Sequence, residues 1–290
     1  MTHNHSFGTD YQINRLREED LGQMHRSFQE AFSDYPVPYK LSLEDFIRKM
    51  RYKVHLDFKH SYGAFSGEKL VAFLFHSVNH YEKTVMAYNA GTGVIPGHRG
   101  RGLSLELYEA ALPGLKASGI QKGVLEVLEL NEKAINVYRQ VGFETTKQFA
   151  CFQLKHPLRS RTGDVRVISV DSTDFDDLSK FGELNPSFGD TFEQLKYNIS
   201  FETTIHAYSG DQLVGYLIFQ PKLARVTHFA VNKDFRGRGI GKALFLEAKE
   251  KTKKPLTVVN VNREYLDVIA FLEAIGFVNT LDQFEMQLTL

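Results

Sequence analysis

Cysteine is nearly absent from this 290-residue chain, which contains only Cys151. One cysteine cannot form an intramolecular disulfide, so the chain is compatible with a reducing compartment and its fold needs no covalent cross-link. Cys151 falls within a predicted strand over 149–154. We expect it to be a small buried apolar side chain there, not a catalytic thiol.

The sequence has no run of about 18 apolar residues, the length that a transmembrane helix requires. Its first residues show no charged segment followed by an apolar one, so no signal peptide is predicted. We therefore expect a cytoplasmic protein without a membrane partner. His3 and His5 have no third ligand in helical or strand register, and we expect no metal site.

Neither sign of charge is in excess, because 35 basic residues balance 35 acidic ones. The chain therefore has no overall field that would attract nucleic acid or a membrane surface. With 42% hydrophobic and 24% charged residues, its composition is that of an ordinary globular protein. Its length is sufficient for two domains of common size.

A basic, glycine-rich stretch over 94–104 is the most informative part of the chain. A strand-like run over 84–94 precedes it, and Pro96, which has no N–H to donate, ends the strand. After the stretch, leucine and alanine recur at helical spacing up to Gly119. The pattern predicts a strand, a tight turn and a helix.

The turn has the properties of an anion site. Gly100 and Gly102 would lie at the helix N-terminus, where free backbone N–H groups and a partial charge of roughly +0.5 face outward. Arg99 and Arg101 add full positive charge, and glycine lets a ligand approach the backbone closely. A pyrophosphate group fits this description.

The same pattern occurs again 137 residues later, in the segment 231–241. An amphipathic helix follows it, as in the first half. A repeat offset near half the chain length indicates an internal duplication into two similar domains. The residues that repeat the basic glycine turn are Arg236, Gly237, Arg238 and Gly239.

The order of predicted elements supports this duplication. In the first half we expect strands over 11–16, 60–66, 70–77, 84–94, 123–129 and 149–154, and helices over 18–32, 42–53, 103–119 and 131–140. In the second half we expect strands over 165–170, 204–208, 213–220, 225–231, 256–260 and 284–288, with helices starting near Thr173 and Thr191, after the glycine turn and over 265–274. The polar segment 155–164 is the expected linker, which gives domains over 1–155 and 164–290.

These motifs resemble the GNAT N-acetyltransferase superfamily, in a tandem arrangement. The family signature V-x-P-x-x-R-G-x-G-[ILV]-[GAS] is followed by N-x-x-A-x-x-[FVL]-Y-x-x-x-G-F in the next strand and helix. The first half is similar to both parts. The matching residues are Val94, Pro96, Arg99, Gly100, Gly102, Leu103, Ser104, Asn131, Ala134, Val137, Tyr138, Gly142 and Phe143.

The second half matches the turn but departs from the later motif. Arg236, Gly239 and Gly241 occupy the core positions of the turn. However, Leu272 stands where the first half has Tyr138, and Tyr265 stands where it has Asn131. The resemblance thus covers nearly the whole chain, and its chemistry is better supported in the first half.

The resemblance implies an α/β (α+β) fold of two GNAT-like domains, each a mixed, mostly antiparallel sheet that splays open and is flanked by helices. It implies acetyl-CoA, or another acyl-CoA, as cofactor, with its pantetheine arm in the opening and its pyrophosphate at the turn. It further implies direct transfer of the acetyl group to a primary amine of a small molecule or peptide. The implied cofactor-binding residues are Val94, Arg99, Gly100, Arg101, Gly102, Leu103, Ser104, Asn131, Val231, Arg236, Gly237, Arg238, Gly239, Ile240 and Gly241.

Direct transfer needs a neutral amine, although a free alkyl amine has a pKa of about 10.4. Glu126, on the strand after the turn helix, is the candidate to take the proton; Glu129 is an alternative on the opposite strand face. Either could instead be a solvated surface charge. Tyr138 stands where the family places the donor to the leaving thiolate, and packing of the amphipathic helix is its structural alternative.

The acceptor is expected to bind near the first helices and their connection. Phe32, Asp34 and Tyr35 are candidates there, since an acid attracts an amine and aromatic rings shape a pocket. Structural roles in a turn are the alternative for all three. The sequence does not identify the acceptor.

Other readings of the chain remain open. One or both domains could bind acyl-CoA without catalysis, or the C-terminal domain, with its more complete turn, could be the active one. An RNA-binding role for the Arg-Gly repeats is disfavoured by the overall neutrality, and His98 is expected to be a surface residue. The 23 phenylalanines are compatible with a homodimer.

Overall fold

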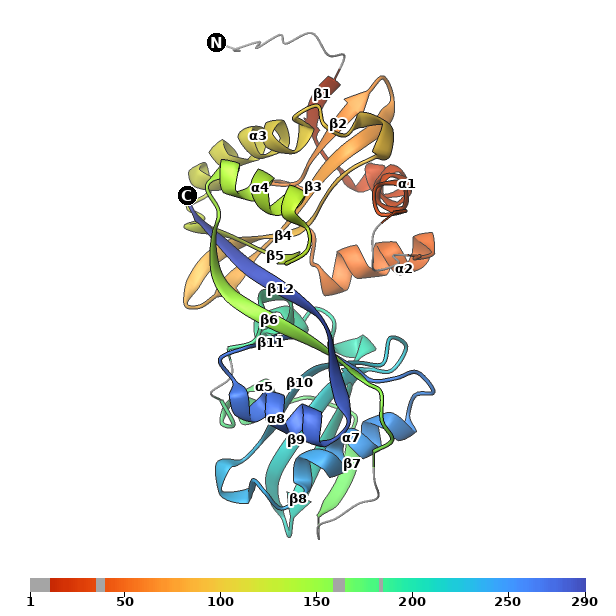
Figure 1. Ribbon diagram of the computed structural model, residues 1–290, viewed down its shortest axis with the longest axis vertical. Helices are drawn as coiled ribbons and strands as arrows, with labels where there is room; N and C mark the ends of the chain where they lie inside the picture. The colour runs from red at the N-terminus through yellow and green to blue at the C-terminus, as the bar shows by residue number, and fades with distance from the viewer. Residues whose placement is uncertain (1–10, 35–39, 159–164, 183–184) are drawn as a thin grey trace. The chain divides into compact units, whose positions relative to one another are not determined.

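The structure is a computed structural model that describes residues 11–34, 40–158, 165–182 and 185–290. The chain divides into two compact units. The first consists of Met1–Leu125, Glu132–Glu144 and Met286–Leu290, and the second of Glu126–Asn131 and Thr145–Glu285. Figure 1 shows strands and helices alternating in both units.

In the first unit, four antiparallel neighbours form most of the sheet: β1 (Tyr11–Arg15), β2 (Tyr62–Ser66), β3 (Lys69–Tyr81) and β4 (Thr84–Val94). β5 (Lys122–Leu128) pairs parallel to β4. The end of β12 (Phe277–Thr289) follows β5 in the strand order. β3 is the most deeply buried strand, since Leu70 to Phe75 are all fully covered. Its apolar run explains this position, because both faces of the strand are packed.

Two pairs of helices cover the sheet of the first unit. α1 (Leu21–Ala31) packs with α2 (Leu43–Arg48), and α3 (Leu103–Ala117) packs with α4 (Glu132–Val141). Figure 1 shows the two pairs on opposite sides of the strands. Ser42 caps α2 as its side chain accepts a bond of 3.1 Å from the Asp45 amide. Single 3₁₀ turns lie at Glu18–Asp20 and Pro96–His98.

The second unit repeats this plan with shorter helices. Its strand order is β12, β6 (Glu144–Leu154), β11 (Thr257–Asn262), β10 (Arg225–Val231), β9 (Gln212–Gln220), β8 (Thr203–Ser209) and β7 (Arg166–Val170). Its helices are α5 (Phe175–Ser179), α6 (Phe192–Leu195), α7 (Ile240–Glu250) and α8 (Leu266–Ala274), and its 3₁₀ turns are Phe188–Asp190, Ile199–Phe201 and Lys233–Phe235. The expected mixed fold with a mostly antiparallel, helix-flanked sheet is confirmed.

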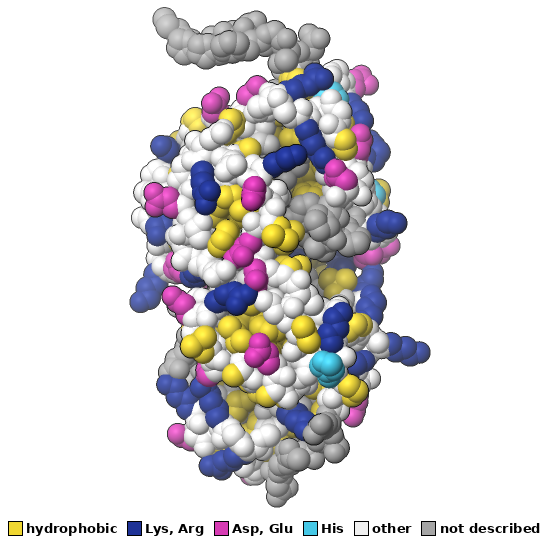
Figure 2. Space-filling view, in the orientation of Figure 1, with side chains coloured by type: hydrophobic (Ala, Val, Ile, Leu, Met, Phe, Trp, Pro, Cys, Tyr) yellow, Lys and Arg dark blue, Asp and Glu magenta, His cyan; other side chains and the backbone are white. Residues whose placement is uncertain are grey.

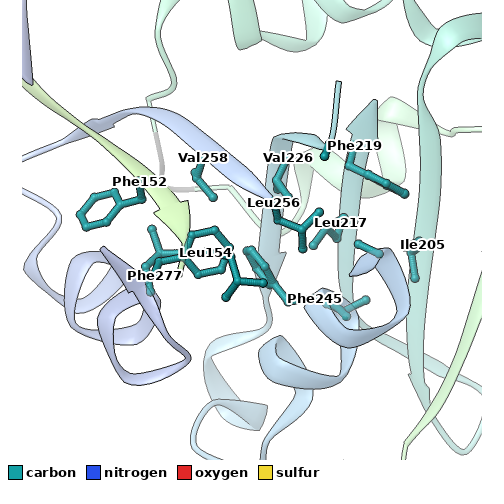
Figure 3. Close-up of a cluster of buried hydrophobic side chains, with 14 of the residues drawn as sticks. Phe152, Leu154, Ile205, Leu217, Phe219, Val226, Phe245, Leu256, Val258 and Phe277 are labelled. Carbon is teal, nitrogen blue, oxygen red and sulfur yellow. The ribbon is translucent and has the colours of Figure 1, made fainter. Parts of the chain in front are cut away.

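The last strand of the first sequence repeat, β6, belongs mainly to the second unit. It pairs antiparallel with β11, in the register Thr257 to Gln153 and Val258 to Phe152. Phe152 and Leu154 of β6 are buried in the core of the second unit beside Phe245 and Phe277, as Figure 3 shows. Cys151, on the same strand, is buried as expected, and burial raises the pKa of its thiol.

The chain end completes the first unit in the same way. The Leu290 amide donates to the Gln121 carbonyl at 3.0 Å. The Leu290 side chain packs against a buried cluster of Ala87, Leu115 and Ile120. The second unit therefore contains β6 from Thr145 on, and the first contains Met286–Leu290, so the boundaries of the compact units differ from those of the expected domains over 1–155 and 164–290. The hydrophobic pattern shows that a strand exists but cannot show which sheet edge it joins.

Several elements differ in length from the sequence-based prediction. β12 begins at Phe277 and not at 284, and β6 begins at Glu144 and not at 149, because strand pairing continues through polar residues. The helix expected over 42–53 is α-helical only to Arg48 and continues as a π-helical segment, Lys49–Lys53. Of the expected linker 155–164, residues 159–164 lie outside the described ranges. Among described residues, no helix combines the length and apolar character needed to cross a bilayer.

Removing Met286–Leu290 should destabilise the first unit selectively. The truncation exposes the edge of β5 and removes the fully buried Met286 and the packing of Leu290. Loss of a buried Met side chain alone lowers the free energy of unfolding by about 2–5 kcal/mol. We expect amide hydrogen exchange in β5 and α3 to accelerate, whereas β8 and β9 keep their protection. A Thr289→Ala variant, exposed in the same strand, is the control. Equal protection of β5 in the truncated and full chains would contradict this assignment.

Candidate acyl-CoA sites

The glycine turn of the first unit adopts the conformation that glycine alone accepts readily. Gly100 and Gly102 have φ values of 75° and 79°, and Gly102 is the left-handed N-cap of α3. Any other residue there would cost about 1–2 kcal/mol. A Cβ added at either glycine would meet no atom within 4 Å, so the space in front of the turn is open. The first amides of a helix have no partner within the helix, so this open N-terminal end of α3 has the properties needed to bind an anion.

The turn of the second unit has almost the same backbone. Gly237 and Gly239 have φ values of 77° and 80°, and Gly239 is the left-handed N-cap of α7. Gly241 differs from its counterpart Ser104: a Cβ at Gly241 would lie 2.8 Å from the Phe271 ring of α8. The family motif's small residue is thus needed here because α8 packs against α7 at this point.

The first arginine of each turn holds the turn to the preceding strand. Arg99 Nε donates to the Val94 carbonyl at 3.1 Å, and Arg236 Nε donates to the Val231 carbonyl at 3.2 Å. Arg99 also binds the Asp34 carboxylate with two bonds of 2.6 and 2.8 Å. These two arginines therefore shape their turns, a role that the sequence pattern alone did not indicate.

The second arginines also make matching backbone contacts. Arg101 donates to the Gly97 carbonyl at 3.5 Å and Arg238 to the Asp234 carbonyl at 2.9 Å, four residues back in both cases. Arg101 further donates to the Tyr11 hydroxyl at 3.0 Å, which is bonded to His98 Nδ1 at 2.7 Å. His98 is thus half-buried beside Tyr11, where we expected a surface residue. Both second arginines remain exposed.

The strands next to each turn separate early. β4 and β5 pair only from Met86–Lys122 to Tyr88–Val124, and β10 and β11 pair only at Arg225–Thr257 and Val226–Val258. A register shift interrupts β4 opposite Phe75 and His76, and another interrupts β10 after Val226. Beyond Tyr88, β4 no longer pairs with β5, and beyond Val226, β10 no longer pairs with β11. The backbone groups on those strand edges are therefore available to an extended ligand.

Two tyrosines lie in the first unit near the point where β4 and β5 separate. Tyr138 of α4 is 8% exposed, and its ring lies edge-on to that of Tyr108 of α3, with centroids 6.2 Å apart. The Tyr108 hydroxyl accepts a bond of 2.7 Å from Asn89 Nδ2, which also donates to Thr92 Oγ1 at 2.8 Å. Burial, together with Tyr138, raises the pKa of Tyr108 well above its usual range, so it stays protonated.

Tyr108 and Asn89 were not identified as functional residues from the sequence. Tyr108 occupies the apolar face of α3 with Leu107 and Ala111, where helical spacing indicates only packing. Asn89 was the available signal, because it is an amide residue in a predicted strand, and the structure shows it to be buried, 7% exposed. Its Oδ1 accepts the Gly91 amide at 2.9 Å and thereby stabilises the irregular backbone of β4.

The predicted glutamates are placed differently from each other. Glu126 is half-buried within β5. Glu129 lies beyond the end of β5, where its carboxylate accepts a bond from Gln148 Nε2. Asn131 directly precedes α4, and its amide donates to the Leu128 carbonyl at 2.9 Å. Of the two glutamates, only Glu126 is in a strand.

Two of the three acceptor candidates, Phe32 and Asp34, lie among the described residues. Phe32 packs against Phe28 and Phe73, with ring centroids 4.7 and 6.3 Å apart. The Asp34 carboxylate is bound by Arg99. Tyr35 lies outside the described residues. The pairing of Asp34 with Arg99 was not predicted, since two residues 65 positions apart carry no sequence signal of their contact.

A pocket lies in the second unit where β10 and β11 separate. It encloses about 490 Å³ including its open mouth, and it is lined by Asn185, Pro186, Ser187, Asp190, Thr227, His228, Phe229, Val258, Val259, Asn260, Val261, Asn262, Tyr265 and Val268. The Tyr216 hydroxyl lies 2.9 Å from His228 Nδ1, and burial lowers the pKa of His228 to about 4, so its ring is neutral near pH 7. Asp190 forms a buried ion pair with Arg225, with bonds of 2.7 and 2.9 Å.

Leu272 replaces the tyrosine of the first unit with an apolar side chain. It is fully buried in the core of the second unit. A proton donor at this position is therefore lost, and packing takes its place. Figure 2 shows basic and acidic side chains interspersed on the visible face of the protein, so the two turns are local basic features.

The Arg99–Asp34 pair makes a prediction about titration. The Arg99 guanidinium lowers the pKa of Asp34 from 3.8 to about 2. Because the folded-state pKa is depressed, the stabilisation from the pair is present above the ordinary pKa and is lost as pH falls through about 2. NMR titration of the Asp34 carboxyl carbon should give a midpoint near 2 in the wild type. Arg99→Gln should return it toward 3.8; an unchanged midpoint would refute the pairing.

Comparison with known proteins agrees with the repeated geometry. Residues 20–143 match the model of the acetyltransferase (GNAT) family, and residues 183–288 match a second acetyltransferase (GNAT) domain model. The N-alpha-acetyltransferase 30 of Schizosaccharomyces pombe is 31% identical over 94 residues, which are 32% of this chain and 63% of that protein. The N-alpha-acetyltransferase MAK3 of Arabidopsis thaliana is 30% identical over 118 residues, 41% of this chain and 62% of that protein.

Among solved structures, a tandem GNAT protein from the clavulanic acid biosynthesis pathway, without AcCoA, is similar over nearly its whole length. Its TM-score is 0.73 at 14% identity, with 96% of this chain and 98% of that chain covered. The chain spans just over three fifths of the length of the two curated relatives. The two domain matches and the shared tandem fold establish that this chain is a tandem member of the GNAT acetyltransferase family.

Proposed function

We propose that this protein is an acyltransferase that transfers the acetyl group of acetyl-CoA, or another acyl-CoA, to a primary amine, with its chemistry in the first unit. The observation that carries the proposal is one arrangement in the first unit. There a left-handed glycine turn, an early separation of β4 from β5 and the buried Tyr138 occur together. The second unit has the first two features but carries Leu272 in place of the tyrosine.

The residues around the first turn fit the pyrophosphate of acyl-CoA. The empty space beyond Gly100 and Gly102 admits an anion, and the amides that begin α3 would hold it together with exposed Arg101. Arg99 would support cofactor binding indirectly, because its bond to the Val94 carbonyl holds the turn in this conformation. When bound, the cofactor would supply a thioester carbonyl at the separated strands, where the unpaired backbone of β4 can bind an extended arm.

Transfer requires two proton movements by residues of this chain. The acceptor ammonium has to lose a proton before its nitrogen attacks. Glu126, which follows the first-unit residues of β5 directly in the chain but is itself assigned to the second unit, is the carboxylate proposed for this step, directly or through water. The Tyr138 hydroxyl would donate a proton to the sulfur that leaves. Tyr108 and Asn89 would keep Tyr138 in place, since the Tyr108 ring packs against it.

The acceptor is proposed as an amine of a small molecule or peptide. Two curated relatives carry the name N-alpha-acetyltransferase, so peptides with a free N-terminal amine are the first acceptors to screen. Because Asp34 is bound by Arg99, we do not assign the amine to its carboxylate. Phe32 would contribute apolar surface next to Phe28 and Phe73.

A second candidate function is acyl-CoA binding, or catalysis, in the second unit. The pocket at the separation of β10 and β11 favours it, because that pocket combines polar groups with an open mouth beside the second turn strand. His228, which lines this pocket, is neutral near pH 7 and can form hydrogen bonds there without carrying charge. The second turn keeps the same glycine conformation as the first, which binding requires even if catalysis does not occur.

Matched glycine variants should assign cofactor binding to each unit. Gly100→Ala and Gly237→Ala place a Cβ in equivalent open space at φ values of 75° and 77°. We expect isothermal titration with acetyl-CoA to show at least a tenfold weaker site in Gly100→Ala. Gly97→Ala, which also faces open space but has no positive φ, should bind as the wild type does. If Gly100→Ala binds acetyl-CoA as the wild type does, the first unit is not the cofactor site.

Tyrosine variants should locate the chemistry. A positioned acid contributes about 10²- to 10⁴-fold to rate, so Tyr138→Phe should lower kcat by a factor in that range and leave acetyl-CoA affinity unchanged. Tyr216→Phe, which removes the hydroxyl next to His228 in the second unit, should retain activity. The measurement is CoA thiol release with the best acceptor of an amine panel. If Tyr216→Phe loses activity and Tyr138→Phe keeps it, catalysis takes place in the second unit.

A further inference from the structure

Asp57, His60 and Ser118 form a polar chain in the first unit at the C-terminal end of α3. The glycine turn lies at the opposite end of this 15-residue helix. At 1.5 Å per residue the helix separates the two places by about 22 Å. The proposed acetyltransferase site uses none of these three residues.

The three side chains are linked by two hydrogen bonds in series. Ser118 Oγ lies 3.0 Å from His60 Nε2, and His60 Nδ1 lies 2.8 Å from Asp57 Oδ2. Since Nδ1 donates to the carboxylate, Nε2 is the free acceptor for the serine hydroxyl proton. This is the relation of nucleophile, base and orienting acid found in serine hydrolases, which is recognised by geometry and not by fold.

The orienting carboxylate is held from several sides. Asp57 Oδ1 accepts the Lys59 amide at 2.8 Å, and the Asp57 carbonyl accepts the Ser61 hydroxyl at 2.7 Å. The Asp57 amide donates to the His76 carbonyl at 2.8 Å, which ties this turn to β3. His60 is only 3% exposed. The imidazole is therefore held in one orientation before any ligand arrives.

The serine itself is accessible. Ser118 is the exposed C-cap residue of α3. Gly119 follows it in a left-handed conformation, with φ of 72°, and a Cβ there would meet nothing within 4 Å. A small molecule can therefore approach Ser118 Oγ from the surface while His60 remains covered behind it.

Lys59 supplies the positive charge that such a site requires. Its Nζ lies 2.9 Å from Ser118 Oγ. The amides of Ser118 and Gly119 already donate to carbonyls of the last turn of α3, at 3.1 and 3.0 Å. The Lys59 ammonium is thus the cationic donor available, next to the serine, to a carbonyl oxygen that becomes negative during attack.

We propose that Ser118, His60 and Asp57 form a second reactive site that hydrolyses small activated carboxylic esters. Ser118 Oγ bonds to the ester carbonyl carbon as its proton passes to His60 Nε2. The bond from that carbon to the leaving oxygen then breaks, and His60 returns the proton to the departing alcohol. Water, deprotonated by His60, attacks the acyl-serine, releases the carboxylic acid and restores the Ser118 hydroxyl. Asp57 is a positioning residue throughout.

A fluorophosphonate probe tests the nucleophile directly. Attack by Ser118 Oγ forms an O–P bond, breaks the P–F bond and releases fluoride, while the proton passes through His60. We expect intact-protein and peptide mass spectrometry to find one label per chain, on Ser118, and none there in Ser118→Ala. Ser179→Ala removes another exposed serine at a helix end and should leave labelling unchanged. An unlabelled wild type, or a label elsewhere, would overturn the proposal.

Two further variants separate reactivity from packing. Lys59→Met keeps the three-residue chain but removes the exposed ammonium, and it should lower hydrolysis of p-nitrophenyl acetate by about 100-fold. Asp57→Asn keeps an acceptor for the Lys59 amide and should slow fluorophosphonate labelling at least tenfold, with circular dichroism unchanged. If ester hydrolysis is equal in wild type and Ser118→Ala, the cluster only fastens α3 to the turn before β2. Acetyl-CoA binding measured in parallel keeps this result separate from the proposed transferase.

Discussion

The left-handed backbone at Gly100 and Gly102 is the constraint on which the first unit's site depends. It turns the chain from β4 into α3 so that the first amides of the helix face open space and not another element. The Nε bond from Arg99 to the Val94 carbonyl closes the turn against its own strand. Because the second unit reproduces both features at Gly237, Gly239 and Arg236, the geometry is a property of the motif and not of one domain.

The early separation of β4 from β5 leaves room beside this turn for the rest of an extended ligand. β4 pairs with β5 over three residues only, and the buried Asn89 holds the irregular backbone just beyond by bonding to Gly91, Thr92 and Tyr108. Buried amides are tolerated only when their hydrogen bonds are satisfied, and here two partners are in β4 and one is in α3. Asn89 thus connects the backbone irregularity to Tyr108, and through its ring to Tyr138.

The two units have diverged in what fills the space behind the turn. In the first, Tyr108, Tyr138 and Phe143 pack edge to face, and two of these rings carry a hydroxyl. In the second, Phe245, Leu272 and Phe277 stand at the corresponding positions and give apolar packing, while polar groups gather on β10, β11 and the segment around Asp190. The second unit also contains β6 of the first sequence repeat, and the first unit contains the last residues of the chain, Met286–Leu290. The stability of each unit therefore depends on residues from both sequence repeats, although the residues behind the two turns differ.

The sequence by itself determined the duplication, the element order, the fold class and the two glycine turns, because periodicity and glycine placement are local properties. A helix beginning at Ser42 and a buried strand position for Cys151 followed from the same local logic. Only the tertiary structure decided that β6 belongs to the second unit, that Asp34 binds Arg99 and that Tyr108 meets Asn89. These contacts join residues far apart in the chain, and neither periodicity nor residue type specifies which distant partner a strand edge, a carboxylate or a hydroxyl will find.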